Sequence, residues 1–185
     1  YLINFGIVEE VEKVAQQVED GLSRFSLNPS TEKVLLMNTA ILLFIAEKFE
    51  TCSLWCNRLI KNRNKSIRPE IDRGIQFIKC ISFYELEDID AFENSLRSAT
   101  RFFNKEKDQY LSYYLSFLSK TRKLADLPTS EVKGQLKNIK VFINQMRDEI
   151  QGRVPLGGID EMTICWIDSR LNSISIVEAV RATKQ

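Results

Sequence analysis

The residues whose types and spacing are most typical of metal ligands in this chain are Cys52 and Cys56, which lie four positions apart. That spacing is about one helical turn, so a helix would bring both thiols to one face. Two thiols at this spacing can ligate a metal, but the chain contains no histidine. Both residues also fall at apolar positions of a helical pattern, where small buried cysteines act as hydrophobic side chains. We therefore expect both thiols in the core and predict no cofactor.

A second set of reactive residue types is the acidic cluster of Glu85, Glu87, Asp88 and Asp90. These carboxylates resemble a metal-binding cluster, but they fall at a predicted turn and helix start, where acidic side chains complement the helix dipole. Because histidine is absent, the usual acid–base pairs and nucleophile triads cannot form. We predict a protein that is not an enzyme. A helical-bundle enzyme would need a pocket with converging carboxylates, which the sequence does not reveal.

The elements that hold these residues repeat about every 40 positions. Residues 43–52 and 83–92 share a run of large apolar residues, a short acidic turn and a bulky residue after it. Apolar residues then recur at helical spacing, and the series continues into a third copy. The matched positions are Cys52, Phe92 and Val132; Cys56, Leu96 and Leu136; and Leu59, Ala99 and Ile139. A repeat of this length with two helices per copy predicts a solenoid of antiparallel helical hairpins.

The composition fits a single domain with a real core. The 185 residues include 44% apolar and 28% charged residues, and the net charge is +1. Such neutrality argues against a dedicated nucleic-acid binder, which carries a basic excess. The longest apolar run, residues 40–46, is too short for a membrane span. Buried free thiols favour a reducing compartment, so we expect a cytoplasmic protein. We also expect a fragment of a longer chain, because the first residue is Tyr1.

Apolar periodicity predicts helices throughout and no strand. Asn28 is expected to cap a helix that begins at Pro29, and Pro69 is expected to open another. Further expected helices cover residues 3–25, 105–123 and 161–171, and the tail after residue 172 adds a short helix or frays. The expected repeat units are residues 1–30, 31–68, 69–104 and 105–151, followed by a C-terminal cap over 158–185.

The first copy has a small residue midway along its first helix (Ala40), an aromatic residue that opens its second helix (Phe49), and small residues at Cys52 and Cys56. In this pattern it resembles a degenerate tetratricopeptide repeat. The second copy departs further from the family pattern, and glutamate replaces the usual turn glycine in both copies. The period of about 40 also exceeds the family's usual 34.

From Asn38 to Trp166 the chain is similar to the C-terminal part of uncharacterised bacterial proteins of this repeat type. The segments that carry this similarity are residues 84–88, 97–103 and 166–169. The resemblance implies a right-handed solenoid with a C-terminal capping helix. It also implies a concave groove that binds a protein or a peptide.

In such a solenoid the first helix of each hairpin lines the groove. The expected groove residues are Met37, Asn38, Ile41, Phe44, Phe77, Ile81, Tyr84 and Tyr113. In chaperone-binding members of the family, an asparagine near the position of Asn38 clamps a peptide carboxylate. The matching position of the second copy is Ile78, which favours an ordinary backbone-bonding role for Asn38. Tyr113 and its neighbours either stack on a ligand or pack in the core with their hydroxyls at the rim.

A run of cations with no acid between them forms a candidate basic patch. Its members are Arg58, Lys61, Arg63, Lys65 and Arg68. Such a run can hold phosphates or an acidic peptide. It also spans the C-terminus of a predicted helix, where cations are favoured, and this position favours a solvated link over a binding patch.

Together with the resemblance, these patterns predict a non-catalytic scaffold that binds a protein or a peptide. The alternative is the peptide-sensing regulatory part of a transcriptional regulator whose upstream part binds DNA. The sequence does not indicate the partner, the pathway, the oligomeric state or the face that binds.

Overall fold

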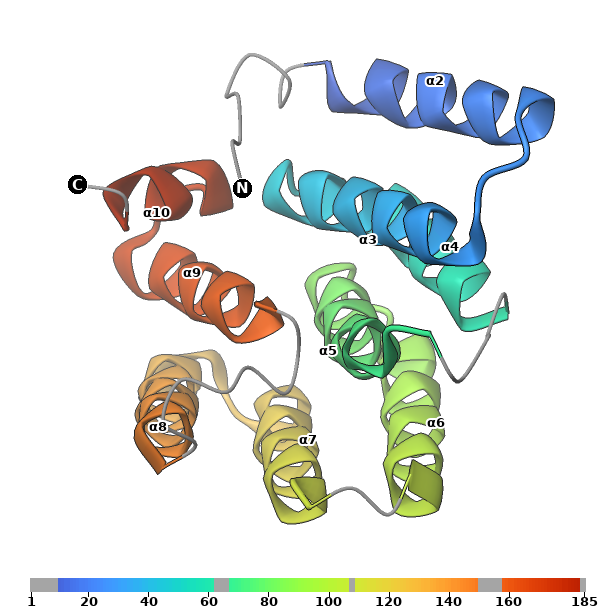
Figure 1. The fold of residues 1–185 in the computed structure, drawn as a ribbon. Coiled ribbons are helices and arrows are strands. Elements are labelled where there is room, and N and C mark those ends of the chain that lie inside the picture. Colours follow the sequence, from blue (N-terminus) through green and yellow to red (C-terminus); the bar gives the residue numbers. More distant parts are fainter. Residues whose placement is uncertain (1–9, 62–66, 107–108, 150–157, 184–185) are drawn as a thin grey trace.

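The computed structural model describes residues 10–61, 67–106, 109–149 and 158–183. These residues form an all-α structure, as predicted, and no strand occurs among them (Figure 1). The helices are α2 (Val11–Arg24), α3 (Pro29–Ile45), α4 (Phe49–Lys61), α5 (Pro69–Glu85), α6 (Ile89–Glu106), α7 (Leu111–Asp126), α8 (Thr129–Glu149), α9 (Ile159–Asn172) and α10 (Ile176–Ala182). In the described ranges, no helix combines the length and the apolar character that crossing a bilayer requires.

The local sequence explains where α3 and α5 begin. The side chain of Asn28 accepts a hydrogen bond from the backbone N–H of Thr31 at 2.9 Å, and Pro29 occupies the first turn, as predicted. Pro69 opens α5 in the same way. The residue before it, Arg68, has a left-handed backbone with φ 52° and provides no side-chain cap. These two helices therefore start 40 residues apart, at residues 29 and 69, and each has a proline at its first position.

Two equivalent turns connect α3 to α4 and α5 to α6. Each contains a glutamate in the left-handed conformation, Glu47 with φ 57° and Glu87 with φ 56°. The N–H of Glu47 donates to the carbonyl of Phe44 at 3.0 Å, and the N–H of Glu87 donates to that of Tyr84 at 3.1 Å. Glycine is usual at such positions because it adopts this backbone without steric cost. The helices α4, α6 and α8 begin at residues 49, 89 and 129, so the period in the sequence is also a period in the helix starts.

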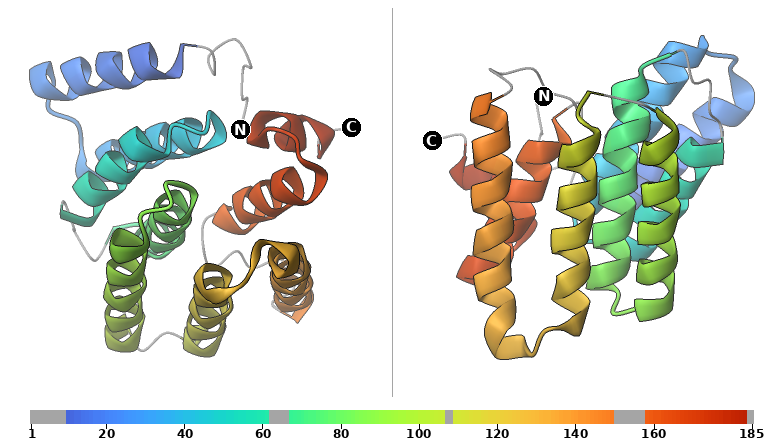
Figure 2. Two further views of the ribbon diagram at one scale, coloured as in Figure 1. Left: turned by 180° about the vertical axis from the view of Figure 1, so that it is seen from behind. Right: turned by 90° about the horizontal axis from the view of Figure 1, so that it is seen from below.

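Each helix packs against the next along the chain, and the chain curls back on itself (Figures 1 and 2). Figure 2 shows α5, α6, α7 and α8 running alongside one another. The later helix α9 contacts α8 and α10 and also the much earlier α5. The C-terminal part therefore returns to the first half of the fold.

The core is a continuous set of apolar side chains between neighbouring helices. An aromatic cluster joins α5, α6 and α7. The ring centroids of Phe77 and Phe117 are 4.5 Å apart, and those of Phe103 and Tyr114 are also 4.5 Å apart. Aromatic pairs at such distances contribute roughly 0.5–1.5 kcal/mol each beyond the burial of their area. Trp166 is also buried in the core, as predicted.

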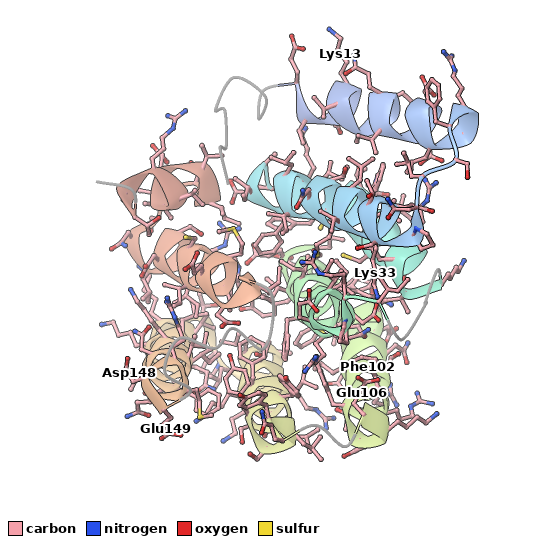
Figure 3. All side chains as sticks on the ribbon, viewed as in Figure 1. Lys13, Lys33, Phe102, Glu106, Asp148 and Glu149 are labelled. Atoms are coloured by element: carbon pink, nitrogen blue, oxygen red, sulfur yellow. The ribbon has the colours of Figure 1, made fainter. Side chains whose placement is uncertain are left out.

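Two cations 40 residues apart each contact the first helix of the next hairpin. Lys33 of α3, which is labelled in Figure 3, lies between neighbouring helices. Its ammonium lies 2.8 Å from the Asp72 carboxylate of α5 and donates to the carbonyl of Ile67 at 2.6 Å. Arg73 of α5 donates to the Tyr114 hydroxyl of α7 at 3.3 Å. Each contact joins the first helix of one hairpin to the first helix of the next. Because a buried lysine without a partner is costly, the Lys33 contact strongly favours this alignment of α3 and α5.

Some predicted boundaries differ from the structure. α6 extends to Glu106 and α7 begins at Leu111, whereas the sequence predicted a helix from residue 105. The expected C-terminal cap consists of two helices, α9 and α10. Of the helix predicted over residues 3–25, residues 3–9 lie outside the described residues.

We predict that Glu87→Gly stabilises the fold by about 1 kcal/mol, because glycine removes the steric cost of a left-handed residue. Glu87 is exposed and forms no ion pair among the described residues, so the substitution removes no contact of this kind. Glu47→Gly relieves the same backbone but also removes a contact to Arg170, and should therefore gain less. Urea unfolding followed by circular dichroism measures both; equal gains for the two variants would contradict this interpretation.

Candidate functional site

The structure places five of the eight predicted groove residues in the core, which corrects the expectation that they line an open groove. These buried residues are Met37, Phe44, Phe77, Ile81 and Tyr113, each less than 5% exposed. The Phe44 ring packs edge-on against Phe49 of α4, with centroids 5.7 Å apart. Tyr113 stacks on Phe142 of α8 at 5.5 Å. Their apolar faces therefore pack against neighbouring helices and leave little surface for a ligand.

The other three predicted groove residues, Asn38, Ile41 and Tyr84, are half-buried. The chain itself covers Tyr84, because the Trp166 ring of α9 lies 6.1 Å from it, nearly perpendicular. A helix of the same chain thus occupies the place beside α5 where a bound peptide was expected.

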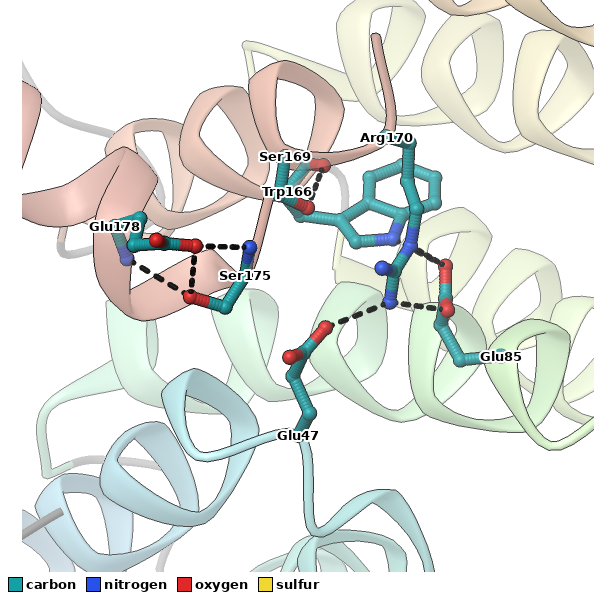
Figure 4. A network of polar contacts seen from close by, with 7 residues as sticks. All are labelled: Glu47, Glu85, Trp166, Ser169, Arg170, Ser175 and Glu178. Carbon is teal, nitrogen blue, oxygen red and sulfur yellow. Dashed lines mark hydrogen bonds and ion pairs between the residues drawn. The ribbon is translucent and has the colours of Figure 1, made fainter. Parts of the chain in front are cut away.

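An ionic network holds α9 in this place (Figure 4). The guanidinium of Arg170 donates to both carboxylate oxygens of Glu85, at 2.9 and 2.5 Å, and to Glu47 at 3.0 Å. The indole N–H of Trp166 donates to Glu85 at 2.5 Å. The Glu85 side chain is only 11% exposed, so its charge depends on these donors. The network joins α9 to the end of α5 and to the turn after α3.

Sequence reasoning assigned Glu85 to dipole compensation and did not identify Arg170. The repeat did contain one indication that Glu85 has a buried partner. Glu85 occupies the position that corresponds to Ile45, 40 residues earlier, so an acid stands where the first copy is apolar. An acid at an apolar position of a repeat needs a buried partner.

The cysteines lie in the core, as expected. Cys52 and Cys56 are both buried, with their sulfur atoms 4.0 Å apart, and Cys52 donates to the carbonyl of Ala40 at 3.3 Å. Burial raises the pKa of Cys56 well above its usual value and raises the pKa of Cys80 to about 12, so both remain protonated thiols. Among the described residues, no three acidic or cysteine side chains are grouped so that they could hold a metal ion.

The basic run does not form a uniform cationic surface. Arg58 pairs with Glu19 of α2, and Arg68 pairs with Glu70. Lys61 is exposed at the end of α4. The remaining two members, Arg63 and Lys65, lie outside the described residues. Two of the five cations are therefore already neutralised by carboxylates of the same chain.

A buried acid lies in the first turn of α9. Asp160 is 5% exposed, and its Oδ1 has no hydrogen-bond partner in the described part of the chain. Burial raises the pKa of this carboxyl to about 6, although the nearby Arg147 opposes the shift. The Asp160 charge in turn helps burial to raise the pKa of Tyr113. The helix that closes the fold thus starts with a carboxyl that resists ionisation.

Among the described residues, an apolar cleft lies between α2 and α3. Its volume is about 320 Å³, and it is lined by Val14, Gln17, Val18, Gly21, Leu22, Phe25, Leu27 and Leu35. All but one of these residues lack a polar side chain. Phe25, directly after α2, is 67% exposed, although a buried aromatic ring would be more stable. A Cβ added at Gly21 would meet no atom within 4 Å, so space is open beside the last turn of α2. The cleft can receive an apolar side chain from outside.

Comparisons of this chain with protein-family models, with curated proteins and with solved structures find no match.

We predict that Arg170→Ala lowers the free energy of unfolding by about 2–3 kcal/mol, because it leaves the Glu85 carboxylate buried without its main partner. Arg122→Ala provides the control, since Arg122 pairs with Glu93 at 3.0 Å but is 61% exposed and should cost less than about 1 kcal/mol. Chemical denaturation measures both variants. Equal losses would show that Glu85 and Arg170 behave as a surface pair.

We predict that Asp160→Asn stabilises the fold at neutral pH by about 2–3 kcal/mol and much less near pH 4. The folded-state pKa, about 6, lies above the ordinary value of 3.8, so the native state binds the proton more tightly than the unfolded state. The parent therefore loses stability relative to the variant as pH rises from about 4 to about 6, and the difference is constant above that range. Urea unfolding at several pH values across this range measures the difference in the free energy of unfolding. The substitution Glu161→Gln, at an exposed neighbouring acid, is the control. A difference that does not change with pH would contradict the raised pKa.

Proposed function

We propose that this chain is a non-catalytic protein-interaction module of the tetratricopeptide-like type, built as a right-handed solenoid of helical hairpins. The observation that carries this proposal is the shared period of sequence and structure. Helix starts recur after 40 residues, the turns at Glu47 and Glu87 have the same backbone, and Lys33 and Arg73 each contact the first helix of the next hairpin. Stacks of this kind act mainly by presenting extended surfaces to other proteins.

The binding surface in this proposal is the cleft between α2 and α3. The side of α5 where the sequence placed a groove is covered by α9, through Trp166 and Arg170. The cleft, in contrast, is apolar, open and bordered by an exposed ring, Phe25. An open apolar cleft between two helices suits an amphipathic helix that inserts apolar side chains into it. The partner class is therefore a protein or peptide that presents such a helix.

The chain offers a pair of substitutions that tests this surface. Gly21 and Gly134 both lie inside helices, and a Cβ at either position meets no atom within 4 Å. Replacing either by arginine should therefore keep the fold and raise helix stability by roughly 0.5–1 kcal/mol. Only Gly21→Arg places a long charged side chain in the cleft.

We predict that helical peptides selected from a display library on the parent chain bind Gly134→Arg equally well and Gly21→Arg at least roughly tenfold more weakly, a loss of about 1.4 kcal/mol or more. Isothermal titration calorimetry with each purified chain measures the dissociation constants, and circular dichroism confirms folding. Failure to select any peptide, or equal binding to all three chains, would argue against an interaction site in this cleft.

A further inference from the structure

The α2–α3 cleft lies where the repeat would place one more helix. We propose that a helix of the same polypeptide fills this cleft, made of residues 1–5 and of residues that precede Tyr1 in a longer form of the chain. This helix would be the first of a hairpin in which α2 is the second. Such an occupant rests on the proposed function, in which the cleft is a site for an amphipathic helix.

α3 is less covered on its cleft side than α5 is on the equivalent side. Leu35 lines the cleft, and Thr31, Asn38 and Leu42 share its side of α3 at helical spacing. Thr31 is exposed and the other three are half-buried, whereas the residues 40 positions later on α5 are all buried; these are Ile71, Ile75, Ile78 and Ser82. The hairpin of α3 and α4 packs against α5, and the Ser82 hydroxyl lies 3.5 Å from the Cys52 sulfur of α4. α3 therefore lacks the cover that a complete preceding hairpin gives to α5.

α2 is also less covered than the helix that it matches. Its residues precede those of α4 by 41 positions, in the pairs Val11 and Cys52, Val14 and Trp55, Ala15 and Cys56, and Val18 and Leu59. The first and third pairs are buried in both helices. Val14 and Val18 line the cleft and are half-buried, whereas Trp55 and Leu59 are buried. Both walls of the cleft are thus surfaces that another helix covers one repeat later.

The sequence before α2 continues the period. Residues 1–9 lie outside the described residues, but Gly6 stands 41 positions before Glu47, whose backbone is left-handed with φ 57°. Glycine adopts this backbone without steric cost, so the sequence predicts a turn at Gly6 like those at Glu47 and Glu87. The apolar residues on either side match as well, in the pairs Leu2 and Leu43, Ile3 and Phe44, and Val8 and Phe49. Residues 1–5 therefore match the end of a first helix.

The proposed helix is longer than residues 1–5. α3 begins at residue 29 and is followed by its turn at Glu47, and α5 begins at residue 69 and is followed by its turn at Glu87. A helix of the same length before Gly6 would begin about 13 residues ahead of Tyr1. Residues 1–5 alone are too short for a stable helix, so the cleft stays open in the 185-residue chain.

The cleft does not have the character of a terminal surface. The end repeats of a helical stack carry polar outer faces that keep the stack soluble. Among the described residues that line the cleft, Gln17 alone has a polar side chain, and Phe25 is 67% exposed. An apolar surface of this kind indicates a contact with another element.

The proposed helix and a helix of a partner would use the same cleft. The helix joined to α2 by a short turn has the higher effective concentration, because it is held beside the cleft. A partner therefore binds only when this helix leaves, so the segment before α2 controls access to the binding surface.

Thiol labelling of the 185-residue chain and of the polypeptide read from its own start codon tests the proposal. Leu35→Cys places a thiol in the cleft, and the four described native cysteines are buried. Maleimide should label this thiol readily in the 185-residue chain and at least roughly tenfold more slowly in the longer polypeptide, where the helix protects it. Val141→Cys is the control, since Val141 of α8 is 55% exposed and should be labelled equally in both forms.

A second substitution shows whether the protection arises in the cleft. Combined with Leu35→Cys in the longer polypeptide, Gly21→Arg should restore fast labelling because it places a long charged side chain in the cleft. Gly134→Arg, on α8, should leave the thiol protected. Equal labelling of Leu35→Cys in the two forms, or continued protection in Gly21→Arg, would overturn the proposal. A reading frame that begins fewer than about 13 residues before Tyr1 would also overturn it.

Peptide binding distinguishes this proposal from the proposed function. A helical peptide selected on the 185-residue chain should bind the longer polypeptide at least roughly tenfold more weakly, because it must displace the attached helix. Equal binding to both forms would contradict the attached helix and leave the interaction module in place. If no peptide is selected but labelling shows protection in the cleft, the interaction site is wrong and the attached helix stands.

Discussion

The contact of Arg170 with Glu85 and Glu47 is the interaction on which the arrangement of this fold depends. Its three residues come from α9, from the end of α5 and from the turn after α3. Glu85 is nearly buried, so its charge is compatible with folding only when α9 supplies a donor. The same contact brings Trp166 against Tyr84. The Arg170 contact therefore holds the last two helices, α9 and α10, against the first half of the fold.

This closure separates the residues that hold the helices together from the apolar surface that stays open. Apolar residues that a repeat pattern assigns to a groove instead stabilise contacts between helices, as Phe77 does with Phe117. An open apolar surface lies where α2 covers α3 incompletely. The helices at the two ends of the described chain therefore differ. α10 buries Ile176 and Val180, while α2 leaves an open cleft beside Val14 and Gly21.

The sequence predicted those parts of the structure that depend on neighbouring residues. Asn28 and Pro29 determine a helix start by themselves, and the period of 40 follows from residues compared along the chain. The burial of the expected groove residues could not be predicted, because an apolar residue such as Phe44 has the same periodicity whether it faces a groove or another helix. The Arg170 contact was missed because its partners lie 85 and 123 residues away. Openness of the cleft beside Val14 likewise depends on the angle between two helices.

The long sequence separation of the Arg170 contact has a consequence for how the chain loses its structure. A row of hairpins that touch only their neighbours can fray from either end, one hairpin at a time. Here the last hairpin also holds the first two turns, and a contact across 123 residues forms only after a large loop has closed. Unfolding of α9 therefore leaves the Glu85 carboxylate, at the end of α5, without its donors. The two halves should unfold as one cooperative unit rather than piece by piece.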